Sequence, residues 1–138
     1  MSLLADIYIS SDSEAVKYDT TPNQFAARVQ YTGFSPLELS TLWAAMRNEQ
    51  WNVALMKQFD CLLQKDGGER LIHKLPSAMV TDLAKFNSEQ IQAAAAKWAA
   101  TDELKCKPSD VQPIIESLVN LSQQAIQKSQ NIYLWNCV

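Results

Sequence analysis

The C-terminal stretch "NIYLWNCV", residues 131–138, decides the fold, because most of its side chains are apolar or aromatic. Read as a β-strand, it carries apolar side chains on both faces: Ile132, Leu134 and Val138 on one, and Tyr133, Trp135 and Cys137 on the other. A strand of this kind is covered on both sides or lies in the middle of a sheet. We therefore predict that the end of the chain is a structural strand against which helices pack.

Two other segments have the pattern of strands. "DIYIS", residues 6–10, has isoleucines on one side and a tyrosine on the other, and it is the expected partner of the C-terminal strand. "FAARVQY", residues 25–31, alternates apolar and polar residues as an edge strand with one solvent-facing side does. Residues 11–23 are polar and turn-rich, which indicates a surface loop. The predicted sheet therefore contains both chain ends.

Helical periodicity fills most of the remaining chain. Apolar residues spaced by three and four positions form the buried faces of about five helices. These faces are Leu39, Leu42, Trp43 and Met46; Trp51, Leu55, Met56 and Phe59; Met79, Val80, Leu83 and Phe86; Ile91, Ala94, Ala95 and Trp98; and Ile114, Ile115, Leu118, Leu121 and Ala125. The pattern predicts an α+β domain of about five helices packed on a small sheet.

Helix starts are marked by capping sequences. Ser35 and Glu38 in "SPLE" have the spacing of a capping box, and Asn87 and Gln90 in "NSEQ" repeat it. In the last helix we expect Pro113 to lie within the first turn, where a missing N–H costs little.

Composition points to one domain, 1–138, without a nucleic-acid or membrane partner. The 138 residues are 47% hydrophobic and 20% charged, which are ordinary values for a globular domain. The net charge is −3 and the 12 basic residues are scattered, so no stretch is suited to phosphates or to an anionic membrane. The first four residues lack the features of a signal peptide, and the three cysteines cannot all pair with one another. We expect reduced thiols in a cytoplasmic protein.

Cys61 and His73 are the first candidates for chemistry. If residues 61–63 and 71–73 form two arms of a hairpin, thiol and imidazole face each other as a minimal nucleophile and base, which Asp60, Asp66 or Glu69 could orient. The spacing matches no catalytic signature, and cysteines often fill a core instead. We therefore treat catalysis by this pair as the alternative hypothesis.

Metal and phosphate sites are disfavoured. Cys61, Cys106, Cys137 and His73 have the ligand count of a structural zinc site, but they lack the short chelating pair that such sites contain. Gly67-Gly68 lies between Asp66 and Glu69, whose charges would repel phosphate, so we expect a plain turn. We predict no metal and no cofactor.

We predict the binding surface around Trp51, Asp66, Glu69, Arg70 and His73, at the loop before the third helix. Trp51 starts a helix and is the tryptophan expected to be partly exposed, where it could line a pocket or anchor a partner. The mixed charges predict a protein partner or a small polar ligand, and their plainer interpretation is a solvated loop with ion pairs worth ~1 kcal/mol or less. An exposed His73 would make binding depend on pH between about 6 and 7.

In "GGERLIH", "LPSAMVTDLAKF" and "IYLWNCV", over the last half of the chain, the sequence resembles small bacterial proteins of the YfbM-like kind. The resemblance implies the order of strands and helices and no activity. From the residues we expect a non-catalytic protein-interaction or regulatory module, such as an immunity protein. The alternative is a small enzyme or ligand-binding protein centred on Cys61, His73 and the "KDGGER" loop. We expect a monomer, or a dimer formed through a sheet edge.

Overall fold

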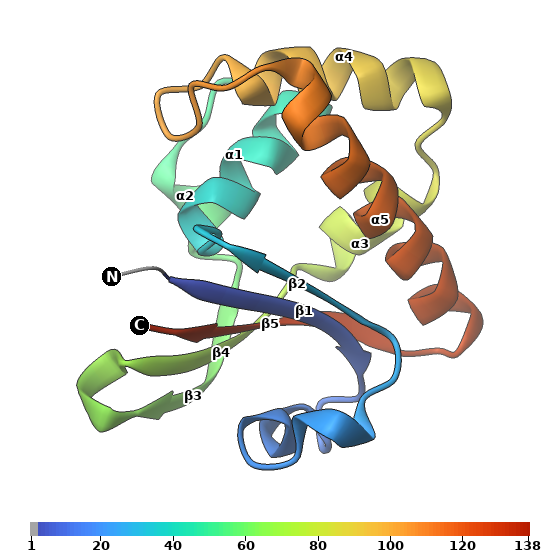
Figure 1. The fold of residues 1–138 in the computed structure, drawn as a ribbon. Coiled ribbons are helices and arrows are strands. Elements are labelled where there is room, and N and C mark those ends of the chain that lie inside the picture. The colour runs from blue at the N-terminus through green and yellow to red at the C-terminus, as the bar shows by residue number, and fades with distance from the viewer. Residues whose placement is uncertain (1–2) are drawn as a thin grey trace.

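The computed structural model describes residues 3–138, which form an α+β domain with helices on one face of an antiparallel sheet (Figure 1). Met1 and Ser2, on which the expectation about a signal peptide partly rests, lie outside the described residues. The strands are β1 (Leu4–Ser10), β2 (Arg28–Thr32), β3 (Asp60–Lys65), β4 (Arg70–Lys74) and β5 (Asn131–Cys137), arranged in the order β2-β1-β5-β4-β3. Both chain ends therefore lie in the sheet, as predicted.

The C-terminal strand β5 is the central strand. It pairs with β1 along its whole length, from Leu4 opposite Cys137 to Ser10 opposite Asn131, and with β4 on its other side. Ile132 and Leu134 are fully buried under the helices, and Tyr133 is buried on the opposite face. The prediction that this strand pairs with the N-terminal strand and lies in the middle of the sheet is confirmed.

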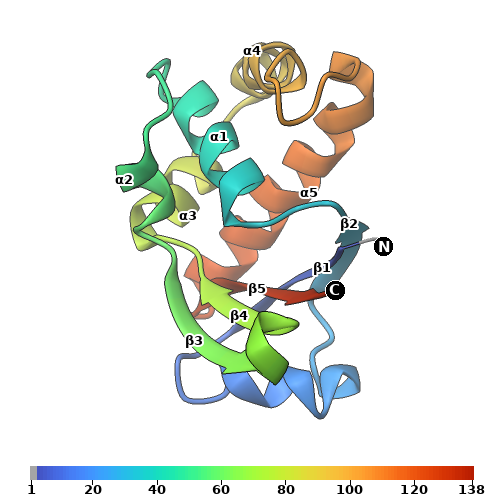
Figure 2. The same cartoon turned by 90° about the vertical axis from the view of Figure 1, so that its left-hand side faces the viewer.

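All five α-helices cover the same face of the sheet (Figures 1 and 2). They are α1 (Pro36–Met46), α2 (Val53–Met56), α3 (Ser77–Ala84), α4 (Ser88–Ala99) and α5 (Pro108–Gln127). The capping boxes predicted at Ser35 and Asn87 are both present, so local signals were sufficient to place two helix starts. The buried indoles of Trp43 and Trp98 lie in the core between the helices and the sheet.

The last helix starts slightly before Ser109-Asp110, the position at which its sequence predicts the start. It begins at Pro108, and the Asp110 carboxylate accepts a hydrogen bond from the backbone N–H of Lys107 at 3.0 Å. Pro113 therefore lies in the second turn, not in the first turn as expected, and it removes one hydrogen bond from the helix interior.

Residues 11–23 do more than form a surface loop. Together with Gln24 they form two 3-10 turns, η1 (Ala15–Asp19) and η2 (Pro22–Gln24), which lie against the face of the sheet opposite the helices (Figure 1). Tyr18 is buried there and stacks on Tyr8 of β1, with ring centroids 4.1 Å apart. The predicted strand at residues 25–31 begins only at Arg28, because Phe25 packs on these two tyrosines instead of continuing the strand.

Removal of residues 132–138 should unfold the protein. The deletion takes away Ile132, Tyr133 and Leu134, which are fully buried, and each large buried apolar side chain is worth roughly 1.5–3 kcal/mol. Since a domain is stable by only about 5–15 kcal/mol, the truncated chain should lose its cooperative urea transition in circular dichroism. Val138→Ser, at an exposed position, should unfold like the full chain. A native-like transition in the truncated chain would show that β5 is dispensable.

Candidate functional site

The region expected to be a loop before the third helix is a β-hairpin. β3 and β4 pair antiparallel and are joined by the tight turn η3 (Asp66–Gly68). Gly67 and Gly68 have φ angles of +69° and +97°, a backbone conformation that glycine adopts without steric cost. The turn predicted at Gly67-Gly68 is confirmed, but strands lie on both sides of it, with β3 ending at Lys65 and β4 beginning at Arg70, so consecutive side chains of these strands point to opposite faces.

Arg70 lies on the face of the sheet that η1 covers. Its guanidinium is 3.3 Å from the carboxylate of Asp66 and 3.6 Å from that of Asp19. Lys65 Nζ lies 3.3 Å from the same Asp19 carboxylate, and Trp135 Nε1–H donates a hydrogen bond to it at 3.0 Å. The Asp19 side chain is only 1% exposed. The centre of this charged cluster is therefore Asp19, which was not among the residues predicted from the sequence.

The charge of Asp19 is stabilised by its partners. Burial by itself would raise the pKa of the Asp19 carboxyl, but the hydrogen bond from Trp135 and the two nearby cations outweigh burial and lower the pKa. Glu69, by contrast, is exposed, and its backbone carbonyl accepts a hydrogen bond from Val138 N–H at 2.9 Å. The cluster thus ties η1 and the hairpin to the C-terminal strand.

Cys61 and His73 are cross-strand partners, as the hairpin hypothesis required. The Cys61 thiol donates a weak hydrogen bond to the Leu63 carbonyl at 3.4 Å, and no hydrogen bond joins it to His73 within the described chain. His73 is half-buried, its Nδ1 has no hydrogen-bond partner among the described residues, and burial lowers the pKa of the imidazole. The predicted pH dependence of binding required an exposed His73, and the structure shows the side chain only partly exposed.

The cysteines remain apart as well. Cys61, Cys106 and Cys137 are free thiols. Between Leu3 and Val138, no three histidine, cysteine or acidic side chains come close enough together to hold a metal ion.

Trp51 lies in the helical layer, in a part of the molecule different from the charged hairpin. Its indole N–H donates to the buried Ser40 hydroxyl of α1 at 2.8 Å, and the ring is half-buried. It lines a pocket of about 370 Å³ between α1 and the end of α4. The other lining residues are Thr41, Ala44, Ala45, Asn48, Glu49, Lys97, Thr101 and Glu103. Trp51 is thus partly exposed, as the sequence predicted, but it does not start a helix, because α2 begins at Val53 with Asn52 as its N-cap.

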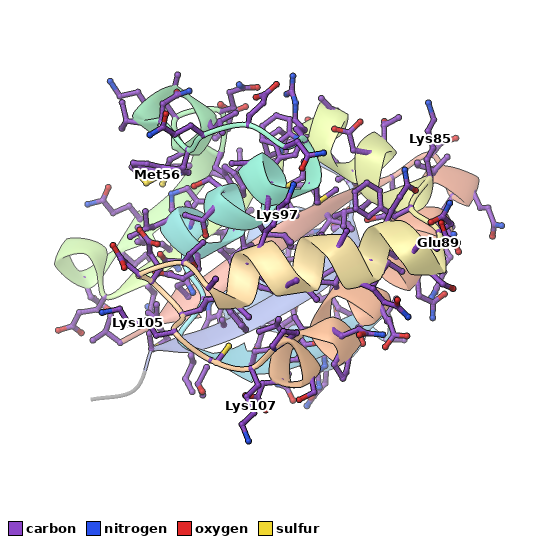
Figure 3. The ribbon with its side chains drawn as sticks, turned by 90° about the horizontal axis from the view of Figure 1, so that it is seen from above. Met56, Lys85, Glu89, Lys97, Lys105 and Lys107 are labelled. Atoms are coloured by element: carbon purple, nitrogen blue, oxygen red, sulfur yellow. The ribbon has the colours of Figure 1, made fainter. Side chains whose placement is uncertain are left out.

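The Trp51 pocket has a small-residue floor and a charged rim. Ala44 and Ala45 leave space beside the indole because their side chains are a single methyl group. Lys97 lies on the side of α4 that faces α1 (Figure 3). Glu49 forms an ion pair with Arg47 at 3.3 Å, whereas Glu103 makes no ion pair in the described part of the chain. The pocket therefore combines an aromatic wall with an available carboxylate.

The five residues predicted as one binding surface occupy three places. Asp66 and Arg70 meet at the hairpin beside η1, with Glu69 in the same turn region. His73 lies on the other face of β4, opposite Leu134, and Trp51 lines the pocket in the helical layer.

Comparison with protein-family models, with characterised proteins and with solved structures finds no significant match to this chain. The likeness to YfbM-like proteins therefore stays a prediction. None of the helices in residues 3–138 is both long and apolar enough to cross a membrane. Function is therefore inferred from the geometry of the pocket and the hairpin.

Asp19→Asn should destabilise the fold more than Asp66→Asn, although both residues pair with Arg70. Asp19 is buried, and besides Arg70 it pairs with Lys65 and accepts a hydrogen bond from Trp135. Loss of its charge should therefore lower the free energy of unfolding by about 1–3 kcal/mol. Asp66 is 60% exposed, and an exposed pair is worth about 1 kcal/mol or less. Urea denaturation of the two variants measures the difference. Equal losses would mean that the buried cluster contributes no more than a surface ion pair.

Stability should fall in two steps on acidification. The folded-state pKa of His73 is lowered by burial, so its contribution is complete above its unfolded pKa of ~6.5 and is lost as pH falls toward the folded value. The pKa values of Asp12 and Asp19 are also lowered, so their contribution is lost only below ~3.9. His73→Gln should abolish the first step in a series of urea midpoints against pH and leave the second. A first step that persists in this variant would assign it to another group.

Proposed function

We propose that this chain is a non-catalytic protein-interaction module, regulatory in the manner of an immunity protein, that binds a lysine or arginine side chain of its partner in the Trp51 pocket. The observation that carries the proposal is the state of Trp51 itself. Its only polar atom is already satisfied by Ser40, so the exposed part of the ring offers an apolar, aromatic surface.

The lining of the pocket fits a cationic side chain with an aliphatic stem. The stem can lie along the indole and the methyl groups of Ala44 and Ala45, and its charged end can reach Glu49 or Glu103 at the rim. A cation over an indole is attracted by about 0.5–2 kcal/mol. Lys97 repels a cation on its own side of the rim, which leaves the carboxylates to orient the incoming group.

Interfaces obtain most of their energy from a few anchors of this kind. Tryptophan is among the residues most enriched at such positions, where truncation costs about 2 kcal/mol or more. The small size of the chain, its mild acidity of −3 and its mixed surface charge are compatible with a role in binding a basic protein segment.

The Cys61 thiol and the His73 imidazole, which a thiol-dependent enzyme would need, do not form a nucleophile–base pair in the described structure. The Cys61 thiol points its hydrogen toward the Leu63 carbonyl, and the lowered pKa of His73 favours a neutral imidazole, which does not stabilise a neighbouring thiolate by charge. The cross-strand placement of Cys61 and His73 nevertheless supports a second candidate, a small thiol-dependent enzyme or ligand binder at the hairpin.

Trp51→Ala should weaken partner binding by about 30-fold, which corresponds to the loss of roughly 2 kcal/mol. The partner is captured from an extract of the cells that produce the protein, and its Kd is then measured by calorimetry. Glu103→Lys should weaken binding in the same direction by adding a positive charge to the rim. A thermal melt of each variant verifies that the fold is retained.

Arg70→Glu serves as the matched control, because it changes the charge of the hairpin and leaves the pocket intact. It should bind like the wild type. A partner that Trp51→Ala retains and Arg70→Glu loses would move the binding site to the charged hairpin predicted from the sequence.

Thiol labelling separates the two candidate functions. If Cys61 has no catalytic role, it should react with iodoacetamide at the same rate in the wild type and in His73→Ala between about pH 6 and 9. Mass spectrometry of the labelled peptides follows Cys61 separately from Cys106 and Cys137. Fast labelling near neutral pH that slows in His73→Ala would support the thiol enzyme instead.

A further inference from the structure

β3 lies at the end of the sheet, and within residues 3–138 it pairs with β4 alone, so its outer edge is not paired with another strand of the described chain. In Figure 2 it is the outermost strand of the hairpin, beyond β4. An edge strand with unpaired N–H and C=O groups is a template for a further strand. What could bind there depends on the side chains that the edge presents.

The β3 sequence "DCLLQK" is complementary to itself when it is reversed. In an antiparallel pair of two such strands, Asp60 of each copy faces Lys65 of the other, and Leu62 faces Leu63 at the centre. Oppositely charged and apolar pairs directly across a ladder are stabilising, whereas like charges are not. A parallel pair in register would instead put Asp60 against Asp60 and Lys65 against Lys65.

The faces of the strand agree with this register because β3 contains a bulge. Residues five positions apart on a regular strand point to opposite faces. The register shift between Cys61 and Leu63 brings Asp60 opposite Lys74 and Lys65 opposite Arg70. Lys74 and Arg70 are four residues apart on β4 and share a face, so Asp60 and Lys65 share it too. Across two copies the carboxylate and the ammonium would therefore lie on the same side of the joined sheet.

We infer that β3 pairs with β3 of a second copy of this chain about a twofold axis, which joins two five-stranded sheets into one continuous sheet. Bulges and charges commonly protect sheet edges from pairing. On β3 the two end charges are opposite in sign, so they select one antiparallel register. Asp60 makes no ion pair within the described residues, whereas Lys65 forms an ion pair with Asp19. The Trp51 pocket lies in the helical layer, so this contact is independent of the proposed function.

Charge reversal tests the register. By light scattering after gel filtration, the wild type should have about twice the monomer mass of 15.5 kDa. Asp60→Lys and Lys65→Asp should each elute as monomers at the same concentration, and the double variant, with both charges exchanged, should again be a dimer. Glu69→Lys, a charge reversal outside the strand, should leave the dimer unchanged. Urea melts show whether each variant is folded. A monomeric wild type at every concentration, or a dimer insensitive to both single reversals, would overturn the inference.

A disulfide trap provides a second readout that does not depend on affinity. In the proposed register Gln64 faces Cys61 of the other copy, while the two residues of one strand are about 10 Å apart, too far to bond. With Cys106 and Cys137 replaced by serine, Gln64→Cys should form a covalent dimer under mild oxidation at least about ten times faster than Glu69→Cys. Equal rates for the two variants would exclude the pairing.

Discussion

The pairing of β5 between β1 and β4 is the constraint on which the rest of the structure depends. β1 and β2 come from the start of the chain, and β3 and β4 form a hairpin from its middle. Within residues 3–138 these two pairs do not hydrogen-bond to each other, and β5 between them joins them into one sheet. The helices then cover one face of the joined sheet, and η1 and η2 cover part of the other (Figure 1). A strand with two strand neighbours and two covered faces has little room for polar side chains, which explains the composition of residues 131–138.

Features encoded in local sequence could be predicted, because the physical cause of each lies within a few residues. A strand that is apolar on both faces, an alternating edge strand and the capping boxes at Ser35 and Asn87 are of this kind. The role of Asp19 could not be found in this way. It lies in a polar stretch, and its importance arises only when Trp135, Lys65 and Arg70 approach it from distant parts of the chain. A buried ion pair leaves no periodic pattern in the sequence. The spacing of Ala15 and Tyr18, beside Asp19, does form a pattern, because residues three apart lie on the same buried side of a short helical turn.

The residues of the predicted binding surface lie in separate parts of the molecule for a geometric reason. Arg70 and His73 are three residues apart, and as part of a loop they could have met at one site. On β4 they project to opposite faces, so Arg70 reaches Asp19 and His73 lies on the helical side. Trp51 was grouped with them by its place in the chain, yet its indole is tied to Ser40 of α1. The prediction of a partly exposed Trp51 concerned a single side chain. It therefore did not depend on the assumption that residues 60–74 form a loop.

Most charges on the η1 face serve the fold. Asp12 pairs with Lys74 and accepts a short hydrogen bond from Tyr133, and the Asp6 carboxylate accepts one from Tyr18 at 2.6 Å. Together with Asp19, these carboxylates fasten the segment from Ser11 to Gln24 to the sheet through aromatic donors. A carboxylate that already accepts such bonds would have to give up its partners to bind another molecule, and that loss is costly when the site is buried. Glu103 at the Trp51 pocket and Asp60 at the sheet edge have no ion pair in the described structure, so they can bind a partner without breaking one.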